Sequence, residues 1–214
     1  MIIAIDGPAA AGKGTLARKL AEHYGYAHLD TGALYRAVAS RVLRAGVAPN
    51  DSAGATEEAQ LLDAGDLLAP DLRTERVSDI ASRVATVPGV RAALLDFQRE
   101  FARRPPEGQK GAVVEGRDIC TVVLPNADKK LFVTASAEVR AERRWKELAA
   151  GGATVSRAEV LKSVVERDRR DEERAQSSLR VAPGAFLLDT TKLDIDAAFD
   201  AAKAFISGQN SRGS

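Results

Sequence analysis

The sequence is poor in the residues on which redox and metal chemistry most often depend. Its 214 residues include one cysteine, Cys120, and two histidines. A single cysteine cannot form an internal disulfide bond, and these residues are too few for a structural zinc site. No apolar run is long enough to cross a membrane, and the opening MIIAIDG lacks the basic flank and cleavage site of a signal peptide. We therefore expect a cytoplasmic protein that does not bind membranes.

An excess of charge of one sign is also missing. Lys and Arg number 31 against 30 Asp and Glu, so the formal net charge is +1, and nothing in the overall charge favours binding to nucleic acid. Hydrophobic residues make up 45% of the chain and charged residues 29%, which is typical of a globular domain. Any anionic ligand must then be held by local clusters of cations.

Short β-branched runs alternate with helical patterns along the chain. We expect strands at residues 2–6, 26–29, 112–115, 130–134 and 185–188. We expect helices at residues 13–24, 31–45, 57–69 and 72–103, the last of them broken near Pro88, with a loop at residues 49–56. Strands separated by helices predict an α/β fold, in which a parallel sheet of about five strands is flanked by helices in three layers.

The segment GPAAAGKGT lies between the first strand and the first helix. Its backbone N–H groups can wrap an anion beside the positive N-terminus of the helix, and Lys13 adds a mobile charge. This context predicts a phosphate-binding P-loop rather than a glycine-rich turn that binds nothing. Gly14 stands where the usual motif has a hydroxyl, so we expect Thr15 to approach Mg²⁺ instead, through water. The loop residues are Gly7, Pro8, Ala9, Ala10, Ala11, Gly12, Lys13, Gly14 and Thr15.

Three further fragments carry arginine in patterns that suit phosphate. In LDTGALYR, Gly32 and Arg36 lie at i and i+4, so Arg36 can point over a glycine floor. In VVEGRDICTVVLP, Arg117 and Asp118 follow a strand, at the sheet edge where α/β proteins bind ligands. The fragment ERDRRDEER places three charged residues on one helical face: Arg167, Asp171 and Arg174. Taken alone, the first pattern also fits an ordinary capped surface helix, the second a surface ion pair and the third a salt-bridged helix.

In order and spacing, seven blocks of the sequence resemble those of bacterial cytidylate kinases, a family of P-loop nucleoside monophosphate kinases. The blocks are IDGPAAAGKGT, LDTGALYRA, ASRVATVPGVRAALLDFQREF, EGRDICTVVLP, KLFVTASAEVRAERR, ERDRRDEER and FLLDTT. The resemblance implies transfer of the γ-phosphoryl group of ATP to CMP and dCMP, with Mg²⁺ as cofactor. A related kinase acting on UMP or another small phosphate monoester, and a nucleotide-sensing module without turnover, stay open as alternatives.

The resemblance also assigns roles to individual residues. It implies that the transferred group is stabilised by Lys13, Arg117, Arg143 and Arg174. Residues 7–15 would hold ATP together with Arg140 and Arg144. The CMP site would comprise Thr31, Arg36, Ser82, Arg91, Arg117, Asp118, Arg167, Asp171 and Arg174, in which Ser82, Arg91 and Asp118 read the cytosine edge.

Within one P-loop kinase domain, the family organisation implies three parts and a tail. The parts are a core (1–30, 105–149 and 176–207), an acceptor-binding region (31–104) and an arginine-rich lid (150–175), followed by a disordered tail (208–214). We expect a monomer and, at Gly151 and Gly152, a hinge for the lid.

The sequence departs from the family pattern at three places. Thr31 replaces a serine, and Cys120 replaces a glycine, which puts a close backbone approach there in question. The stretch 63–72 is short, so the acceptor region should be compact and helical.

Overall fold

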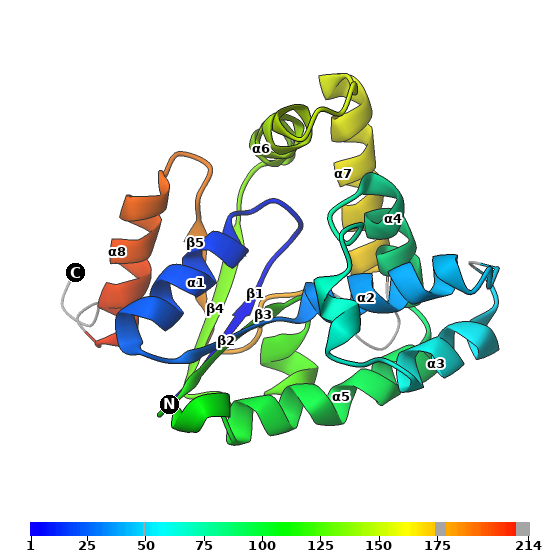
Figure 1. Ribbon diagram of the computed structural model, residues 1–214. Helices are drawn as coiled ribbons and strands as arrows, with labels where there is room; N and C mark the ends of the chain where they lie inside the picture. The colour runs from blue at the N-terminus through cyan, green and yellow to red at the C-terminus, as the bar shows by residue number, and fades with distance from the viewer. Residues whose placement is uncertain (49, 174–178, 209–214) are drawn as a thin grey trace. The chain divides into compact units, whose positions relative to one another are not determined.

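The computed structural model describes residues 1–48, 50–173 and 179–208, which form a sheet and helices that alternate along the chain (Figure 1). The strands are β1 (Ile2–Asp6), β2 (Ala27–Asp30), β3 (Ala112–Gly116), β4 (Lys129–Thr134) and β5 (Phe186–Asp189). Their order in the sheet is β2-β3-β1-β4-β5, and β1 pairs in parallel with both β3 and β4. The predicted five-stranded parallel sheet is confirmed.

Helices fill most of the chain between the strands. They are α1 (Lys13–Tyr24), α2 (Thr31–Arg44), α3 (Ser52–Gln60), α4 (Glu75–Val84), α5 (Pro88–Arg103), α6 (Ala137–Ala150), α7 (Arg157–Glu172) and α8 (Ile195–Ile206). Shorter helical turns are η1 (Gly65–Leu68), η2 (Pro106–Gly108) and η3 (Ile119–Val123). None of the described helices is long and apolar enough to cross a lipid bilayer.

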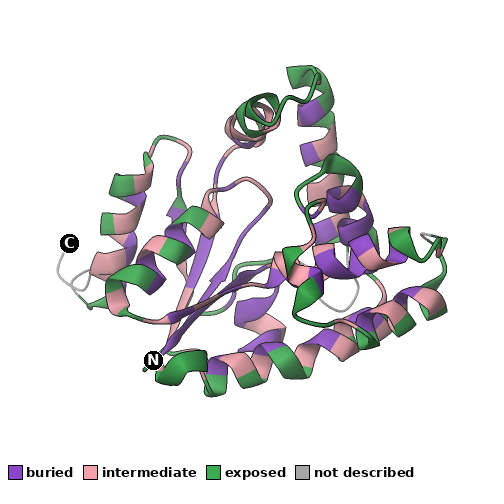
Figure 2. Cartoon of the chain, viewed as in Figure 1, coloured by how far each residue is buried: buried purple, intermediate pink, exposed green. Residues whose placement is uncertain are grey.

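The chain divides into two compact units, and the first contains the sheet. It comprises Met1–His28 and Pro105–Ser214, while the second comprises Leu29–Arg104. In the first unit, α1 and α8 pack side by side against one face of the sheet, where Ile3, Ile5 and Leu131 are fully buried (Figures 1 and 2). The division into core, acceptor region and lid stays a prediction, and the predicted tail lies beyond the described residues from position 209 on.

The pair formed by α6 and α7 has a small core of its own, in which Trp145 packs beside Val160 and Val164. The Trp145 indole donates to the carbonyl oxygen of Val155 at 3.0 Å, so it ties the start of α7 to α6. Gly152 has a positive φ of 81° and closes α6 with backbone hydrogen bonds, which is a helix-capping role. These contacts describe how the turn closes α6, and the hinge expected at Gly151 and Gly152 stays a prediction.

The second unit is built from helices, as expected, with α4 packed on α2 and α5 on α3. One helix differs from the prediction at both ends. The expected helix at 57–69 begins earlier, at Ser52, because the Asp51 carboxylate caps it by accepting from the N–H groups of Ala53 and Gly54 at 3.1 and 3.0 Å. It also ends earlier, at Gln60, and only the short turn η1 follows.

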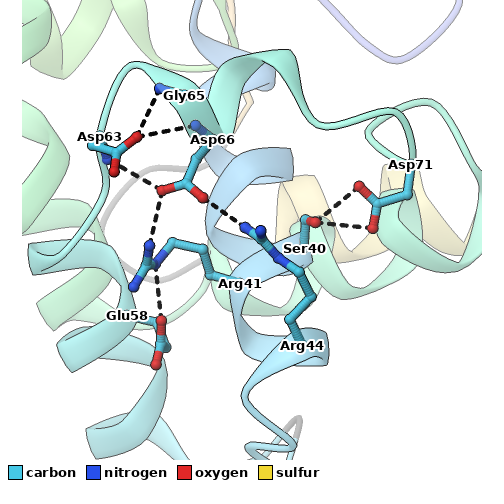
Figure 3. Close-up of polar contacts among 8 residues, drawn as sticks. All are labelled: Ser40, Arg41, Arg44, Glu58, Asp63, Gly65, Asp66 and Asp71. Atoms are coloured by element: carbon cyan, nitrogen blue, oxygen red, sulfur yellow. Dashed lines mark hydrogen bonds and ion pairs between the residues drawn. The ribbon is translucent and has the colours of Figure 1, made fainter.

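Buried ion pairs fix the segment that contains η1. Asp66 is only 6% exposed, and Figure 3 shows Arg41 and Arg44 reaching its carboxylate from α2. The two hydrogen bonds are 2.9 and 2.6 Å long. Burial by itself would raise the pKa of Asp66, but the hydrogen bonds from Arg44 and Arg41 outweigh burial, and the pKa lies below its usual value. The short connection between α3 and α4 is therefore held to α2 by charge rather than by a large apolar core.

Replacing Asp66 with asparagine should destabilise the protein. The variant leaves two arginines facing a neutral amide in a buried place, so the free energy of unfolding at pH 7 should fall by about 1–3 kcal/mol. Denaturant unfolding measures this loss. The matched control is Asp79→Asn, which breaks an exposed pair with Arg83 and should cost less than about 0.5 kcal/mol. Equal losses for the two variants would contradict the role given to Asp66.

Candidate active site

The predicted P-loop connects β1 to α1, as its sequence requires. A Cβ atom at Gly7 would lie 2.0 Å from the carbonyl oxygen of Val133 in β4, so only glycine fits where the loop leaves the sheet. Gly12 has a positive φ of 87° at the start of α1 and offers no side-chain cap. The first N–H groups of α1 therefore lie at a helix N-terminus that suits an anion.

A buried carboxylate lies against this loop. Glu115, at the end of β3, is 3% exposed, and its Oε2 lies 3.7 Å from the Lys13 ammonium. Its other oxygen, Oε1, lies 3.2 Å from Nε2 of His28 in β2. A Cβ atom at Gly14 would lie 3.0 Å from Oε1, so glycine at this position leaves room for the carboxylate. Sequence reasoning did not assign Glu115, although it quoted the strand that ends there.

The end of β3 also brings together two residues that were predicted from separate fragments. Arg117 Nε donates to Asp171 Oδ2 of α7 at 2.8 Å, and the side chains of the two residues are 15% and 3% exposed. Asp118, which follows Arg117 in the sequence, is 4% exposed. Arg167 lies one turn earlier on α7 and is half-buried. Arg174, predicted for the same cluster, lies outside the described residues.

Asp6, the last residue of β1, holds the turn that follows Asp118. Its carboxylate accepts from the N–H groups of Ile119 and Cys120, both at 2.8 Å. Burial is the main cause that raises the pKa of Asp6 to about 6, while these two hydrogen bonds oppose the shift. A charged carboxylate here therefore costs folding free energy at neutral pH.

The Cys120 side chain is accommodated at the position where the family pattern has glycine. It is 2% exposed, and its thiol lies 3.5 Å from the carbonyl oxygen of Ala4 and 3.7 Å from that of Leu131. Burial raises the pKa of this thiol far above its usual range. The side chain thus fits between β1 and β4, while the Cys120 backbone keeps its close approach to Asp6.

The arginines of α6 differ in their surroundings. Arg140 is buried and donates to the carbonyl oxygen of Ala9 in the P-loop at 3.3 Å and, through both terminal nitrogens, to Asp168 of α7 at 2.9 and 2.6 Å. Arg143 donates to Thr190 Oγ1 at 3.0 Å and reaches the carbonyl oxygen of Ala11 at 3.5 Å. Arg140 thus links the loop to α7, and Arg143 lies directly beside the loop.

Arg144 pairs with its own helix instead. Its Nη1 donates to Glu147 Oε2 at 3.0 Å, a contact between neighbouring turns of α6. The predicted ATP contacts of Arg140 and Arg144 stay predictions.

A pocket of about 400 Å³ opens beside the P-loop. Gly12, Thr15 and Arg143 line it on the loop side, and Thr190, Leu193 and Ile195 line it from the connection between β5 and α8. Its wall is mainly apolar with a few polar groups, which is the composition of a small-molecule site. The residues after β5 were missed in the sequence, because the block FLLDTT was noted there without a role.

The second unit holds the other predicted residues. Arg36 Nη2 donates to Asp30 Oδ2 at 2.7 Å, and a Cβ atom at Gly32 would lie 3.0 Å from Arg36 Nη1, so the arginine lies over glycine as predicted. Thr31, at the start of α2, is buried.

The two remaining residues of this unit come from α4 and α5. Arg91 Nη1 donates to the hydroxyl of Tyr35 at 3.3 Å, which joins α5 to α2. Ser82 is 3% exposed, and its hydroxyl has no hydrogen-bond partner among the described residues. A buried hydroxyl of this kind suits a polar ligand.

The raised pKa of Asp6 predicts a pH effect on stability. Between the usual value of 3.8 and about 6, the folded protein holds the Asp6 proton and the unfolded chain releases it, so the group's contribution to the free energy of unfolding falls as the pH rises. In denaturant unfolding at pH 4 to 7, the wild type should lose about 1–3 kcal/mol relative to Asp6→Asn, which does not titrate. A constant difference between the two proteins would show an ordinary pKa for Asp6.

Comparison with known proteins identifies the family. The cytidylate kinase family model matches residues 3–207. A cytidylate kinase of Paramagnetospirillum magneticum (strain ATCC 700264 / AMB-1) is 56% identical over 208 residues, which cover 97% of this chain and 98% of the relative. A cytidylate kinase of Cereibacter sphaeroides (strain KD131 / KCTC 12085) is 55% identical over 211 residues, covering 99% and 97%.

Among solved structures, an uncharacterized protein from Eubacterium ventriosum ATCC 27560 aligns over 99% of both chains with a TM-score of 0.54 at 20% identity, a likeness of fold alone. The full-length agreement with the family model and with the two named kinases carries the assignment, and the chain belongs to the cytidylate kinase family.

Proposed function

We propose that the protein transfers the γ-phosphoryl group of ATP to CMP and dCMP, giving ADP and CDP or dCDP. The observation that supports the proposal is that a chain of this family has two groups that each suit an anion. One is the P-loop with Lys13 in the first unit, and the other is Arg36 over Gly32 in the second. A protein that only binds one nucleotide has no use for the second site.

The donor is assigned to the P-loop and the pocket beside it. The N–H groups of residues 7–15 would surround the β- and γ-phosphates, with Lys13 as a mobile countercharge. The pocket of about 400 Å³, which Leu193 and Arg143 line, would take the adenine ring. Arg143 lies close enough to the loop to share in charge stabilisation, while Arg140 and Arg144 would act at the edge of the donor site.

Mg²⁺ suits the residues beside the loop. Thr15 lines the pocket at the start of α1, and the buried carboxylate of Glu115 lies against Gly14. Hard oxygen donors of this kind suit Mg²⁺, which keeps several waters and binds mainly through substrate phosphates. Thr15 would hold the ion through water and Glu115 through its carboxylate. When bound, the ion would neutralise charge on the β- and γ-phosphates.

The acceptor is assigned to the residues predicted for CMP. Arg36 would bind the CMP phosphate through its guanidinium fork, and Arg117, Arg167, Asp171 and Arg174 would hold the phosphate and the ribose. Cytosine has an amino donor and an N3 acceptor, and uracil reverses both. A carboxylate at Asp118, an arginine at Arg91 and the buried hydroxyl of Ser82 would match cytosine.

Phosphoryl transfer needs alignment and positive charge more than covalent chemistry. The loose transition state spreads charge over the equatorial oxygens of the moving group, and an arginine that meets this charge contributes roughly 10³ to 10⁵ in rate. Lys13, Arg117, Arg143 and Arg174 would supply it. No covalent phosphoenzyme is required, because the in-line attack of the acceptor phosphate moves the group directly from donor to acceptor.

A coupled ADP-release assay with CMP, dCMP, UMP and AMP tests the function. We expect turnover with CMP and dCMP at least tenfold above that with UMP and AMP, because the base edge is read by paired hydrogen bonds. Activity that is highest with UMP or AMP would make the protein a kinase for another acceptor. Nucleotide binding without ADP release above background would make it a sensing module.

Asp118→Ala tests the base-reading assignment. Removing the carboxylate that would accept from the cytosine amino group should lower kcat/KM for CMP by about 10²-fold or more and leave ATP affinity within a factor of about two. Steady-state kinetics with CMP and calorimetric titration with ATP measure the two quantities. Equal losses for both nucleotides would show that Asp118 has a different role.

A further inference from the structure

We propose that Asp6 is a positioning residue for base selection, because it holds the peptide that follows Asp118 and so sets the direction of the Asp118 carboxylate. The inference rests on the proposed function, in which Asp118 reads the cytosine edge. No role in base selection follows from the position of Asp6 in the sequence, where it is simply the last residue before the P-loop.

The first support is the geometry of the carboxylate. Asp6 has no exposed surface, and its two oxygens accept from two successive N–H groups, Oδ1 from Ile119 and Oδ2 from Cys120. Because each oxygen has its own donor at 2.8 Å, the carboxylate cannot rotate without losing a hydrogen bond. Two charge-assisted bonds in a dry place define one position for the turn.

The second support is the part of the turn that Asp6 holds. The N–H of Ile119 belongs to the peptide bond that begins at the carbonyl of Asp118, so fixing it fixes the backbone of Asp118. The Asp118 carbonyl oxygen in turn accepts from the N–H groups of Val122 and Val123 at 2.9 and 3.2 Å. Both ends of this peptide are therefore held, and the Asp118 side chain starts from a rigid base.

The third support is the anchoring of the turn to the sheet. The Cys120 thiol lies between the carbonyl oxygens of Ala4 in β1 and Leu131 in β4. Asp6 itself ends β1, directly before Gly7 of the P-loop. The same strand thus positions the proposed donor site and, through Asp6, the proposed base reader.

The charge of Asp6 provides something that an asparagine could not provide at this position. Asp118 is close enough to Asp6 to raise its pKa by repulsion, in addition to the larger effect of burial. An asparagine in the same place would avoid both costs, but it would offer one acceptor and one donor to two N–H groups. Only a carboxylate accepts from both N–H groups. The need for both hydrogen bonds therefore accounts for a buried charge that an asparagine would avoid.

The test compares selectivity in matched variants. The measured quantity is the ratio of kcat/KM for CMP to kcat/KM for UMP, in the full chain. Asp6→Asn should lower this ratio about tenfold, since one hydrogen bond of the turn is lost and Asp118 is released. Cys120→Ala is the control, because it loosens the packing of the same turn but keeps both backbone donors to Asp6. It should lower the melting temperature and leave the ratio unchanged.

The double variant Asp6→Asn with Asp118→Ala separates the two proposals. If Asp6 acts through Asp118, the double variant has the ratio of Asp118→Ala alone. An unchanged ratio in Asp6→Asn, or an equal fall in Cys120→Ala, overturns the inference while the proposed function stands. An unchanged ratio in Asp118→Ala overturns the base-reading assignment and this inference together. Should Asp6→Asn not fold, Asp6→Ser, which keeps one acceptor and adds no amide donor, takes its place with the same expectations.

Discussion

The structure depends on holding cations in place with carboxylates where water is scarce. The pairs are Lys13 with Glu115, Arg117 with Asp171 and Arg140 with Asp168. A desolvated guanidinium or ammonium without a partner would be costly, and a carboxylate partner also fixes its direction. A phosphate, like a carboxylate, has negatively charged oxygen atoms that accept hydrogen bonds, so it can replace a carboxylate beside such a cation. The protein thus holds its cations in position before a nucleotide arrives.

Much of this arrangement could be predicted from the sequence, because its signals are local. The β-branched run before GPAAAGKGT fixes β1, the loop and α1 together, and the residues of α1 agree with the prediction at both ends. Likewise the i, i+4 spacing of Gly32 and Arg36 is sufficient to place the arginine over the glycine. Asp30 caps α2 by accepting from the N–H of Ala33, which is a contact within one turn.

What could not be predicted depends on contacts between distant parts of the chain. Asp6 meets Ile119 and Cys120 across more than a hundred residues, and neither pattern nor propensity connects them. Glu115 could be placed on its strand, but its contacts with Lys13 and His28 follow only from the order of the strands. The Trp145 indole donates to the carbonyl oxygen of Val155, ten residues further along the chain, and no pattern within one helical turn predicts that contact.

The thiol of Cys120 can report on the opening of the folded protein around it. Cys120 is the single cysteine in the sequence, it is 2% exposed, and its raised pKa leaves almost no thiolate at neutral pH. Alkylating reagents attack the thiolate, so they reach this sulfur only when β1 and β4 separate from the turn. The rate at which such a reagent labels the native protein therefore measures how often the centre of the sheet opens.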